Sequence, residues 1–165
     1  MLKIDFNGYA IGGLAIGETE KERNEIVSFT TDLIPVDKLR YVMGVGDIKS
    51  LINLIELGVD MFDCVWPTRL ARHGTALTME GRVNLGAARY ARSDDPIDPQ
   101  FLLSPASKWS RGYIRHLLSV GEPVAGRLLT LHNLAWTFDF IRRARESIQM
   151  GEFASFRKQT LQIWG

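Results

Sequence analysis

Several features that would place a protein in a special class are scarce in this sequence. Cys64 is the only cysteine in 165 residues, which excludes an intramolecular disulfide and a cysteine-rich zinc cluster. No stretch reaches the roughly 18 consecutive apolar residues of a membrane span, and no apolar run at the N-terminus has signal-peptide length. We therefore expect a protein of the reducing cytoplasm that has no membrane partner.

An excess of charge of either sign is also lacking. Lys and Arg number 20 against 19 Asp and Glu, a net charge of +1, so any nucleic-acid partner requires basic residues that are concentrated locally. Such a concentration follows Pro67, where Glu80 is the only acid among five arginines. These are Arg69, Arg72, Arg82, Arg89 and Arg92. A solvated surface and a phosphate-binding surface both fit this pattern.

The first part of the chain alternates short apolar runs with helical patterns. Strands are predicted at residues 9–11, 39–43 and 59–65. A capping box of Thr19 and Glu22 begins one intervening helix, and Asp47 is a suitable N-cap for the other. Strand, helix, strand, helix, strand at this spacing predicts parallel βα units whose helices cover one outer face of a sheet.

The chain after Pro67 has a different pattern. Residues 74–85 alternate apolar and polar side chains around Glu80 and Gly81, which predicts a hairpin. Residues 93–99 are polar and proline-rich, and we interpret them as a linker. An apolar stripe over residues 109–118 and a pattern over about residues 124–150, with Gly151 beyond it, predict helices.

Functional groups in parallel βα folds collect at the carboxyl ends of the strands. Here these ends carry glycine turns at residues 12–13 and 44–46, and Asp63. Glycine lets backbone groups approach a flat ligand closely, so a small polar ligand beside an acid is predicted. Spacing alone also allows Asp63 to cap a turn or to pair with Arg69 or Arg72. Asp60 lies an odd number of residues away, so strand alternation places the two carboxylates on opposite faces and argues against a catalytic pair.

Three longer motifs resemble a known family. The motifs Tyr-Ala-Ile-Gly-Gly-Leu-Ala-Ile-Gly-Glu at residues 9–18, Tyr-Val-Met-Gly-Val-Gly at 41–46 and the segment 60–72 resemble the C-terminal half of the tRNA-guanine transglycosylase, or queuine tRNA-ribosyltransferase, family. The similarity continues in order through residues 95–99, 110–113 and 131–134.

The resemblance implies an α/β fold that is the C-terminal part of a (β/α)₈ TIM barrel. About three parallel strands with helices would be followed by a hairpin and a helical C-terminal subdomain. Residues 1–92 would form the partial barrel, and residues 93–165 would correspond to the family's zinc-binding subdomain. Because a barrel needs eight strands, we expect a truncated form, or a chain that pairs as a homo-oligomer or with a complementary barrel half.

The resemblance also implies a reaction. Asp63 would attack C1′ of the wobble-position ribose in the tRNA anticodon loop and expel guanine, and a queuine-type deazaguanine would then displace the aspartate. Contacts to the base are implied for Gly13, Leu14, Ala15, Met43 and Gly44, with Glu18 steadying the Leu14–Ala15 peptide. Contacts to RNA are implied for Gly44, Val45, Gly46, Asp47, Ile48, Lys49, Ser50, Thr68, Arg69, Leu70, Ala71 and Arg72. The alternative is a non-catalytic tRNA-binding or dimerisation subunit of the same family.

The family's zinc site is altered in this sequence. Its three cysteine positions fall on Phe101, Leu103 and Ala106, and only the histidine, His132, remains. One imidazole cannot hold a structural zinc that takes four ligands, so no metal or other cofactor is predicted. We expect His132 to be a hydrogen-bonded histidine in a helix packing face. Phe101 and Leu103 would bury apolar area in place of the metal, in a loosely held loop.

Overall fold

The computed structural model describes residues 4–14 and 16–165, which form two compact units. The first unit contains the described residues up to Val65 together with Arg157–Gly165, and the second contains Trp66–Phe156. These compact units divide after Val65, and the division after residue 92 that the resemblance implies, into a partial barrel and a zinc-site region, stays a prediction. The predicted hairpin and residues 93–99 belong to one unit because they pack on each other and on the long helix that follows them.

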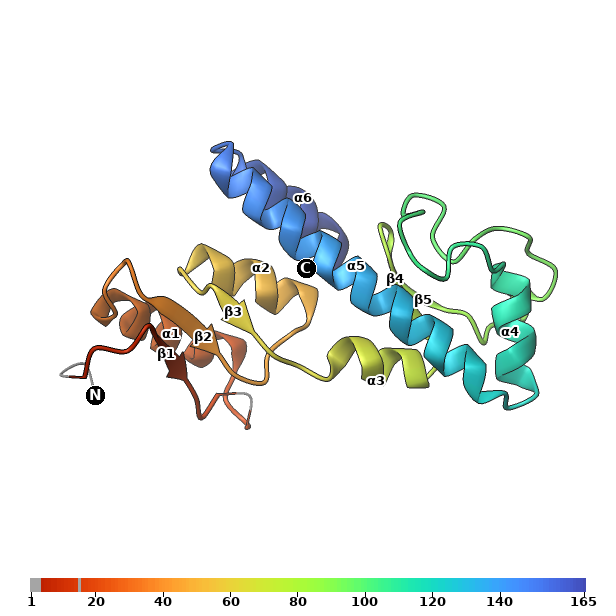
Figure 1. Ribbon diagram of the computed structural model, residues 1–165, viewed down its shortest axis with the longest axis horizontal. Helices are drawn as coiled ribbons and strands as arrows, with labels where there is room; N and C mark the ends of the chain where they lie inside the picture. The colour runs from red at the N-terminus through yellow and green to blue at the C-terminus, as the bar shows by residue number, and fades with distance from the viewer. Residues whose placement is uncertain (1–3, 15) are drawn as a thin grey trace. The chain divides into compact units, whose positions relative to one another are not determined.

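The first unit contains a parallel sheet with the strand order β1-β2-β3 (Figure 1). Its strands are β1 (Gly8–Ile11), β2 (Leu39–Val42) and β3 (Met61–Phe62), and Tyr41 of β2 lies opposite both Ala10 and Met61. The predicted strands and their parallel pairing are confirmed. The third is shorter than residues 59–65. Just beyond its end, the amide of Gly44 donates to the Asp63 side chain.

Two helices connect these strands, α1 (Glu20–Leu33) and α2 (Ile48–Glu56). The predicted capping box is present at α1, where the Glu22 carboxylate accepts from the Thr19 amide at 2.8 Å. Asp47 caps α2 by accepting from the Ser50 amide at 2.9 Å. Both caps satisfy amides that have no partner within the helix.

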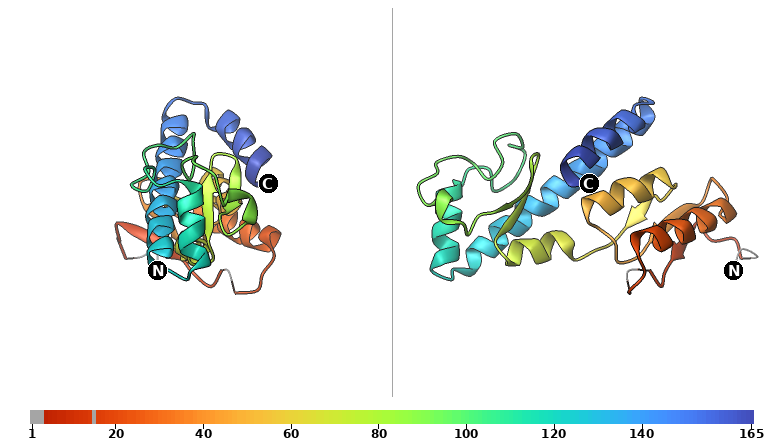
Figure 2. Two further views of the ribbon diagram at one scale, coloured as in Figure 1. Left: turned by 90° about the vertical axis from the view of Figure 1, so that its right-hand side faces the viewer. Right: turned by 180° about the vertical axis from the view of Figure 1, so that it is seen from behind.

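The helices cover one face of the sheet, as predicted. Val27 of α1 and Leu54 of α2 share a core with Ile11 and Val42 of the strands, and Figure 2 shows the strands and helices of this unit from two further sides. Burial of these apolar side chains supplies the main stabilisation of the unit. The opposite face is open: its side chains, which remain exposed, include Ala10, Leu39 and Met61.

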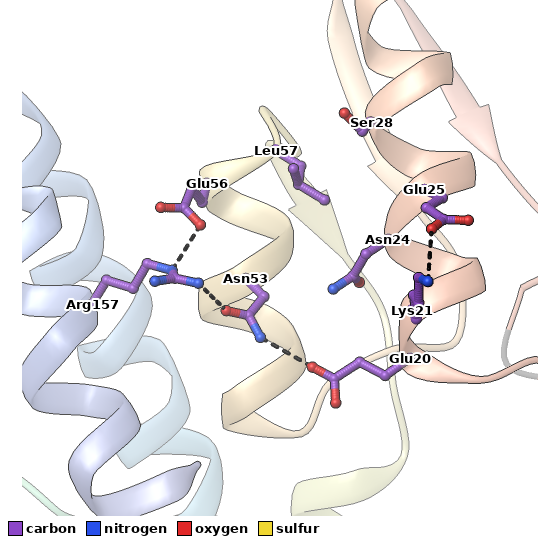
Figure 3. Close-up of a pocket in the computed structure, with 9 residues that line it drawn as sticks. All are labelled: Glu20, Lys21, Asn24, Glu25, Ser28, Asn53, Glu56, Leu57 and Arg157. Atoms are coloured by element: carbon purple, nitrogen blue, oxygen red, sulfur yellow. Dashed lines mark hydrogen bonds and ion pairs between the residues drawn. The ribbon is translucent and has the colours of Figure 1, made fainter.

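A polar network joins α1 and α2 to the last helix, α6 (Phe153–Trp164). Arg157 contacts Glu56 at 2.8 Å and donates to Asn53 at 2.9 Å, and Asn53 donates to Glu20 at 3.2 Å (Figure 3). These residues line a hollow of about 600 Å³ in the first unit. The two separate segments of this unit, the residues up to Val65 and Arg157–Gly165, are thus connected through polar and charged side chains.

The second unit is built on one long helix, α5 (Pro123–Gln149), which confirms the helix predicted near residues 124–150. The predicted hairpin is β4 (Thr75–Thr78) and β5 (Gly81–Asn84), which are antiparallel. The remaining elements are α3 (Trp66–Arg72), the 3-10 turn η1 (Ala88–Tyr90) and α4 (Arg111–Ser119). Ala76, Ile114 and Leu129 are fully buried where the hairpin, α4 and α5 meet.

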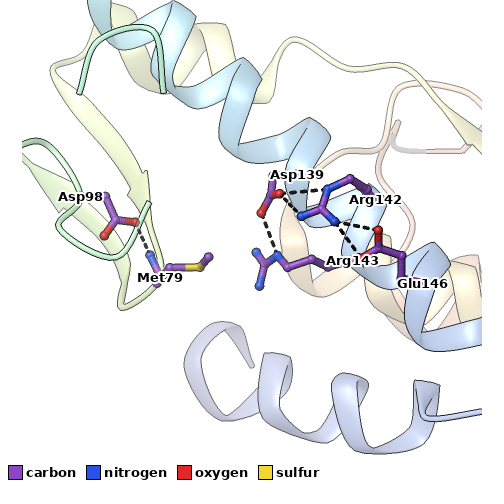
Figure 4. Close-up of polar contacts among 6 residues, drawn as sticks. All are labelled: Met79, Asp98, Asp139, Arg142, Arg143 and Glu146. Carbon is purple, nitrogen blue, oxygen red and sulfur yellow. Dashed lines mark hydrogen bonds and ion pairs between the residues drawn. The ribbon is translucent and has the colours of Figure 1, made fainter. Parts of the chain in front are cut away.

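Residues 93–99 are not the linker that their composition indicated. Ile97 and Asp98 are 0% and 3% exposed, and the Asp98 carboxylate accepts from the Met79 amide at 2.8 Å (Figure 4). A buried aspartate needs such partners, and the hairpin turn supplies one from a distant part of the sequence. Figure 4 also shows Asp139 of α5 paired with Arg142 and Arg143.

No helix in the described part of the chain is both long enough and apolar enough to cross a bilayer.

Candidate active site at the carboxyl ends of the parallel strands

Asp63 immediately follows β3 and is connected to β2 and to the turn after it by two hydrogen bonds. Its Oδ1 accepts from the Tyr41 hydroxyl at 2.7 Å and from the Gly44 amide at 3.0 Å. Gly44 has a φ of 76°, in the left-handed region that glycine adopts without strain. The Asp63 side chain is exposed, so the carboxylate is held in place and is accessible to a ligand.

These contacts determine the charge state of the site. The Tyr41 hydroxyl, followed by the Gly44 amide, lowers the pKa of the Asp63 carboxyl, because both donors favour the ionised form. The same interaction raises the pKa of the Tyr41 phenol. At neutral pH the pair is therefore a carboxylate and a protonated phenol. An ionised carboxylate can act as a nucleophile or stabilise a cationic centre, whereas it cannot act as a general acid.

The turn after β2 lies so close to the segment that carries Asp63 that it requires glycine. A Cβ added to Gly46 would lie 1.8 Å from Sγ of Cys64, so a side chain at this position would displace the segment that carries Asp63. Met43 is 45% exposed, and a Cβ on Gly12 would lie 3.5 Å from its Sδ. The turns after β1 and β2 therefore lie side by side at the end of the sheet where Asp63 is found.

The predicted base-binding residues fall into three groups. Gly13, Met43 and Gly44 lie in the turns at this end of the sheet. Leu14 is 7% exposed and its side chain belongs to the core, so only its backbone is available to a ligand. Ala15 lies outside the described residues. Nearby, the Glu18 carboxylate accepts from the Ile16 and Gly17 amides.

The predicted RNA contacts at residues 44–50 are limited by burial. Val45, Ile48 and Ser50 are 3%, 1% and 5% exposed, so their side chains cannot reach a bound strand. Asp47 uses its carboxylate as the N-cap of α2, and Lys49 pairs with Glu20 at 3.1 Å. Contact with RNA along this segment would therefore be made mainly by backbone groups, and it remains a prediction.

The predicted RNA contacts at residues 68–72 lie on α3, in the second unit. Arg69 and Arg72 are exposed and Ala71 is fully buried. The other three arginines of the basic segment, Arg82, Arg89 and Arg92, are exposed as well. Exposure of all five arginines is what a solvated surface and a phosphate-binding surface both require, so phosphate contact stays a prediction.

Sequence reasoning missed Tyr41 as a partner of Asp63. The strand register holds the signal, because Tyr41 lies opposite Met61 and Asp63 follows two residues later on the same face. Asp60 is separate from this site, since its carboxylate accepts from the Arg40 amide at 2.9 Å, at the other end of β3. The two carboxylates do not form a pair, as expected.

The zinc-ligand positions of the family lie in the second unit and do not fit a metal. Phe101, Leu103 and Ala106 carry no donor atom in their side chains. His132 is fully buried, and both ring nitrogens have hydrogen-bond partners; burial lowers the pKa of the imidazole. Within residues 4–14 and 16–165, no group of three or more His, Cys, Asp and Glu could hold a metal ion. His132 is the hydrogen-bonded histidine that was predicted. Phe101 is buried as expected, but Leu103 is 77% exposed.

Comparison with known proteins identifies the family. The family model described as queuine tRNA-ribosyltransferase matches residues 1–165. A protein named queuine tRNA-ribosyltransferase from Streptococcus pneumoniae strain 70585 is 42% identical over 165 residues, which cover 100% of this chain and 43% of the relative. Proteins of the same name from Geobacillus kaustophilus and Bacillus velezensis are 42% and 44% identical over the same shares. The chain thus spans 43% of the length of these curated relatives. With its whole length matched, the chain belongs to the queuine tRNA-ribosyltransferase family.

Proposed function

We propose that this chain supplies the nucleophile of a tRNA-guanine transglycosylase, and that the nucleophile is Asp63. The observation that carries the proposal is the pair of donors on Oδ1, the Tyr41 hydroxyl and the Gly44 amide. They keep an exposed carboxylate ionised at the end of a parallel sheet where such folds bind their ligands. In the reaction of a ribosyltransferase, such a carboxylate can serve as the nucleophile.

The proposed reaction is a double displacement at the ribose of the tRNA wobble nucleotide. Asp63 attacks C1′ as the bond from C1′ to N9 of guanine breaks, and guanine leaves with the bonding electrons and takes up a proton. A queuine-type deazaguanine loses a proton and attacks C1′, and the bond to Asp63 breaks to restore the carboxylate. Two inversions retain the configuration at C1′. Turns at Gly13 and Gly44 would contact the planar bases through their backbones, and Met43 would pack against one face.

The RNA partner would be bound through its phosphates. The exposed arginines of residues 67–92 supply the positive charge, and the reacting nucleotide has to leave the stacked anticodon loop for C1′ to be accessible. Because the net charge of the whole chain is only +1, attraction of RNA would depend on this local concentration of arginines.

A further part of the barrel is required for turnover. The sheet face bearing Ala10, Leu39 and Met61 is apolar and exposed, and among the described strands β1 and β3 each pair only with β2. The relatives contain much additional sequence, since the match covers 43% of their length. We infer that strands from the corresponding additional sequence cover this face and complete a (β/α)₈ barrel.

Trapping of the covalent intermediate tests the proposal. The chain is combined with a polypeptide equivalent to the unmatched part of a relative, incubated with anticodon stem-loop RNA and analysed on a denaturing gel. We expect an RNA adduct with the wild-type chain and with Asp60→Asn, a carboxylate change at the other end of β3. Asp63→Ala should give none. Adduct that persists in Asp63→Ala would contradict the assignment.

A tRNA-binding or dimerisation subunit is the second candidate. It is favoured by the coverage, since the chain matches only 43% of the relative's length. The unmatched part would hold the family's further base-binding side chains. A native gel shift and a denaturing gel distinguish the two functions, for the chain alone and for the combined sample. RNA that is retained in the native gel but forms no adduct in the denaturing gel would support this function and contradict the catalytic one.

A further inference from the structure

A buried histidine in the second unit is hydrogen-bonded through both ring nitrogens. Nε2 of His132 lies 2.8 Å from the Leu77 carbonyl oxygen of β4, and Nδ1 lies 2.9 Å from Oγ of Ser104. His132 and Ser104 are 0% and 4% exposed. We name the Leu77 carbonyl, the His132 ring and the Ser104 hydroxyl the His132 clasp.

The chemistry of the partners determines where the protons lie. A carbonyl oxygen only accepts, so Nε2 carries the proton and donates to Leu77. Nδ1 of the neutral ring is then an acceptor, and the Ser104 hydroxyl donates to it. Oγ of Ser104 in turn accepts from the Ala106 amide at 3.1 Å. Each polar atom of the clasp has a partner, and no lone pair of the ring is left for a metal.

The clasp lies where the family places its zinc ligands, and the loop around it is held by other contacts. The Phe101 and His132 rings pack in a T-shaped arrangement, with centroids 6.0 Å apart and an interplanar angle of 74°. The Asp98 carboxylate accepts from the Met79 and Gln100 amides at 2.8 and 3.0 Å. The loop that was predicted to be loosely held is therefore anchored to the hairpin and to α5.

We propose that the His132 clasp replaces the metal ion in this chain, and that it joins residues 98–107 to β4 and α5 so that the second unit folds without zinc. A metal would have to break the bond from Ser104 to Nδ1 and would find carbon side chains at residues 101, 103 and 106. A bound metal would link the segments through coordination bonds. In this chain a buried series of hydrogen bonds links three segments instead. The clasp lies entirely within the second unit, and its role is independent of that of Asp63.

The protonation of His132 and the metal content test the proposal directly. Long-range proton–nitrogen NMR spectra of the full chain at neutral pH should show His132 protonated at Nε2 only, with His73 and His116 as reference signals from the same sample. Elemental analysis of chain purified without chelators should show no stoichiometric zinc, and EDTA should leave the unfolding midpoint unchanged. Close to one zinc per chain, or a proton on Nδ1 of His132, would overturn the proposal.

Paired serine variants test the contribution of the clasp to stability. Ser104→Ala leaves the buried Nδ1 without its donor, and we expect the unfolding equilibrium constant to rise about tenfold or more. Ser119→Ala is the matched control, because its exposed hydroxyl donates to a single backbone carbonyl, that of His116, and it should change the constant much less. Equal effects of the two variants would overturn the clasp. If Ser104→Ala does not fold, Ser104→Thr, which keeps the hydroxyl, should retain stability and the Nε2 proton.

Discussion

At the scale of single residues, the properties of Asp63 are determined by donors on the neighbouring strand β2 and in the turn that follows it. The Tyr41 hydroxyl lowers its pKa most, and the Gly44 amide contributes next. A carboxyl whose pKa is lower in the folded state adds stability above its unfolded pKa of about 3.9, and this stability is lost as the pH falls through the folded value. Protonation would also remove the nucleophile.

Tyr41→Phe is therefore predicted to raise the pKa of Asp63 towards its ordinary value. The acid limb of adduct formation should move to higher pH by the same amount, because only the carboxylate reacts. Carbon-13 NMR titration of the Asp63 carboxyl measures the shift. Tyr9→Phe is the control, since that hydroxyl donates to the Ile4 carbonyl and should leave Asp63 unaffected. An unchanged titration in Tyr41→Phe would show that the Gly44 amide alone determines the charge state.

At the scale of elements, the helices beside the site depend on local caps. The carboxylate of Asp47 satisfies the Ser50 amide at the start of α2, and this occupies a residue that the family resemblance assigned to RNA. The buried side chains of Ile48 and Ser50 in the same turn support the structural role.

Asp47→Ala is predicted to reduce the free energy of unfolding by about 1 kcal/mol, which is typical for loss of an N-cap side chain. Urea unfolding of the chain measures this change. Asp47→Asn keeps a capping oxygen and should remain within a few tenths of a kcal/mol of the wild type. If the two variants are equally unstable, the loss does not come from the cap.

Asn133 has a comparable role between elements of the second unit. It is fully buried, accepts from the Leu77 amide at 2.9 Å and donates to the carbonyls of Pro67 and Thr75, each at 3.0 Å. The side chain thus connects α5 to the hairpin and to the start of α3.

Asn133→Ala is predicted to destabilise the chain by about 3 kcal/mol or more, because it leaves a buried amide and carbonyl oxygens without a partner. Chemical denaturation compared with Arg145→Ala, an exposed change on the same helix, measures the difference. A loss below about 1 kcal/mol would indicate that water or a local shift replaces these bonds.

At the scale of the whole molecule, the proposed reaction would need a further polypeptide segment to complete the open sheet. We predict that the 165-residue chain alone exchanges no labelled guanine into tRNA, and that exchange appears when it is co-expressed with the equivalent of the unmatched part of a relative. Asp63→Ala should abolish the restored activity. Exchange by the chain alone, lost in Asp63→Ala, would contradict the need for additional strands, and a sedimentation study would then show whether a second copy covers the sheet.

The sequence by itself determined the order of elements and the position of the carboxylate that we propose as the nucleophile. Alternation, helical periodicity and caps act over a few residues, so the three strands, the capping box at Thr19 and the long α5 could be predicted. Asp63 at the end of the third strand was found in the same way, and the motifs around it indicated the family.

Only the tertiary structure decided which side chains act together. Tyr41 reaches Asp63 across 22 positions of sequence, and His132 reaches Ser104 across 28 and Leu77 across 55. The burial of Asp98 likewise depends on an amide in the hairpin turn. Composition predicted a linker at residues 93–99. A polar residue that bonds to water and one that bonds to a distant backbone amide look the same in the local sequence. Strand register and packing supply these partners, and both depend on contacts between residues that are remote in the chain.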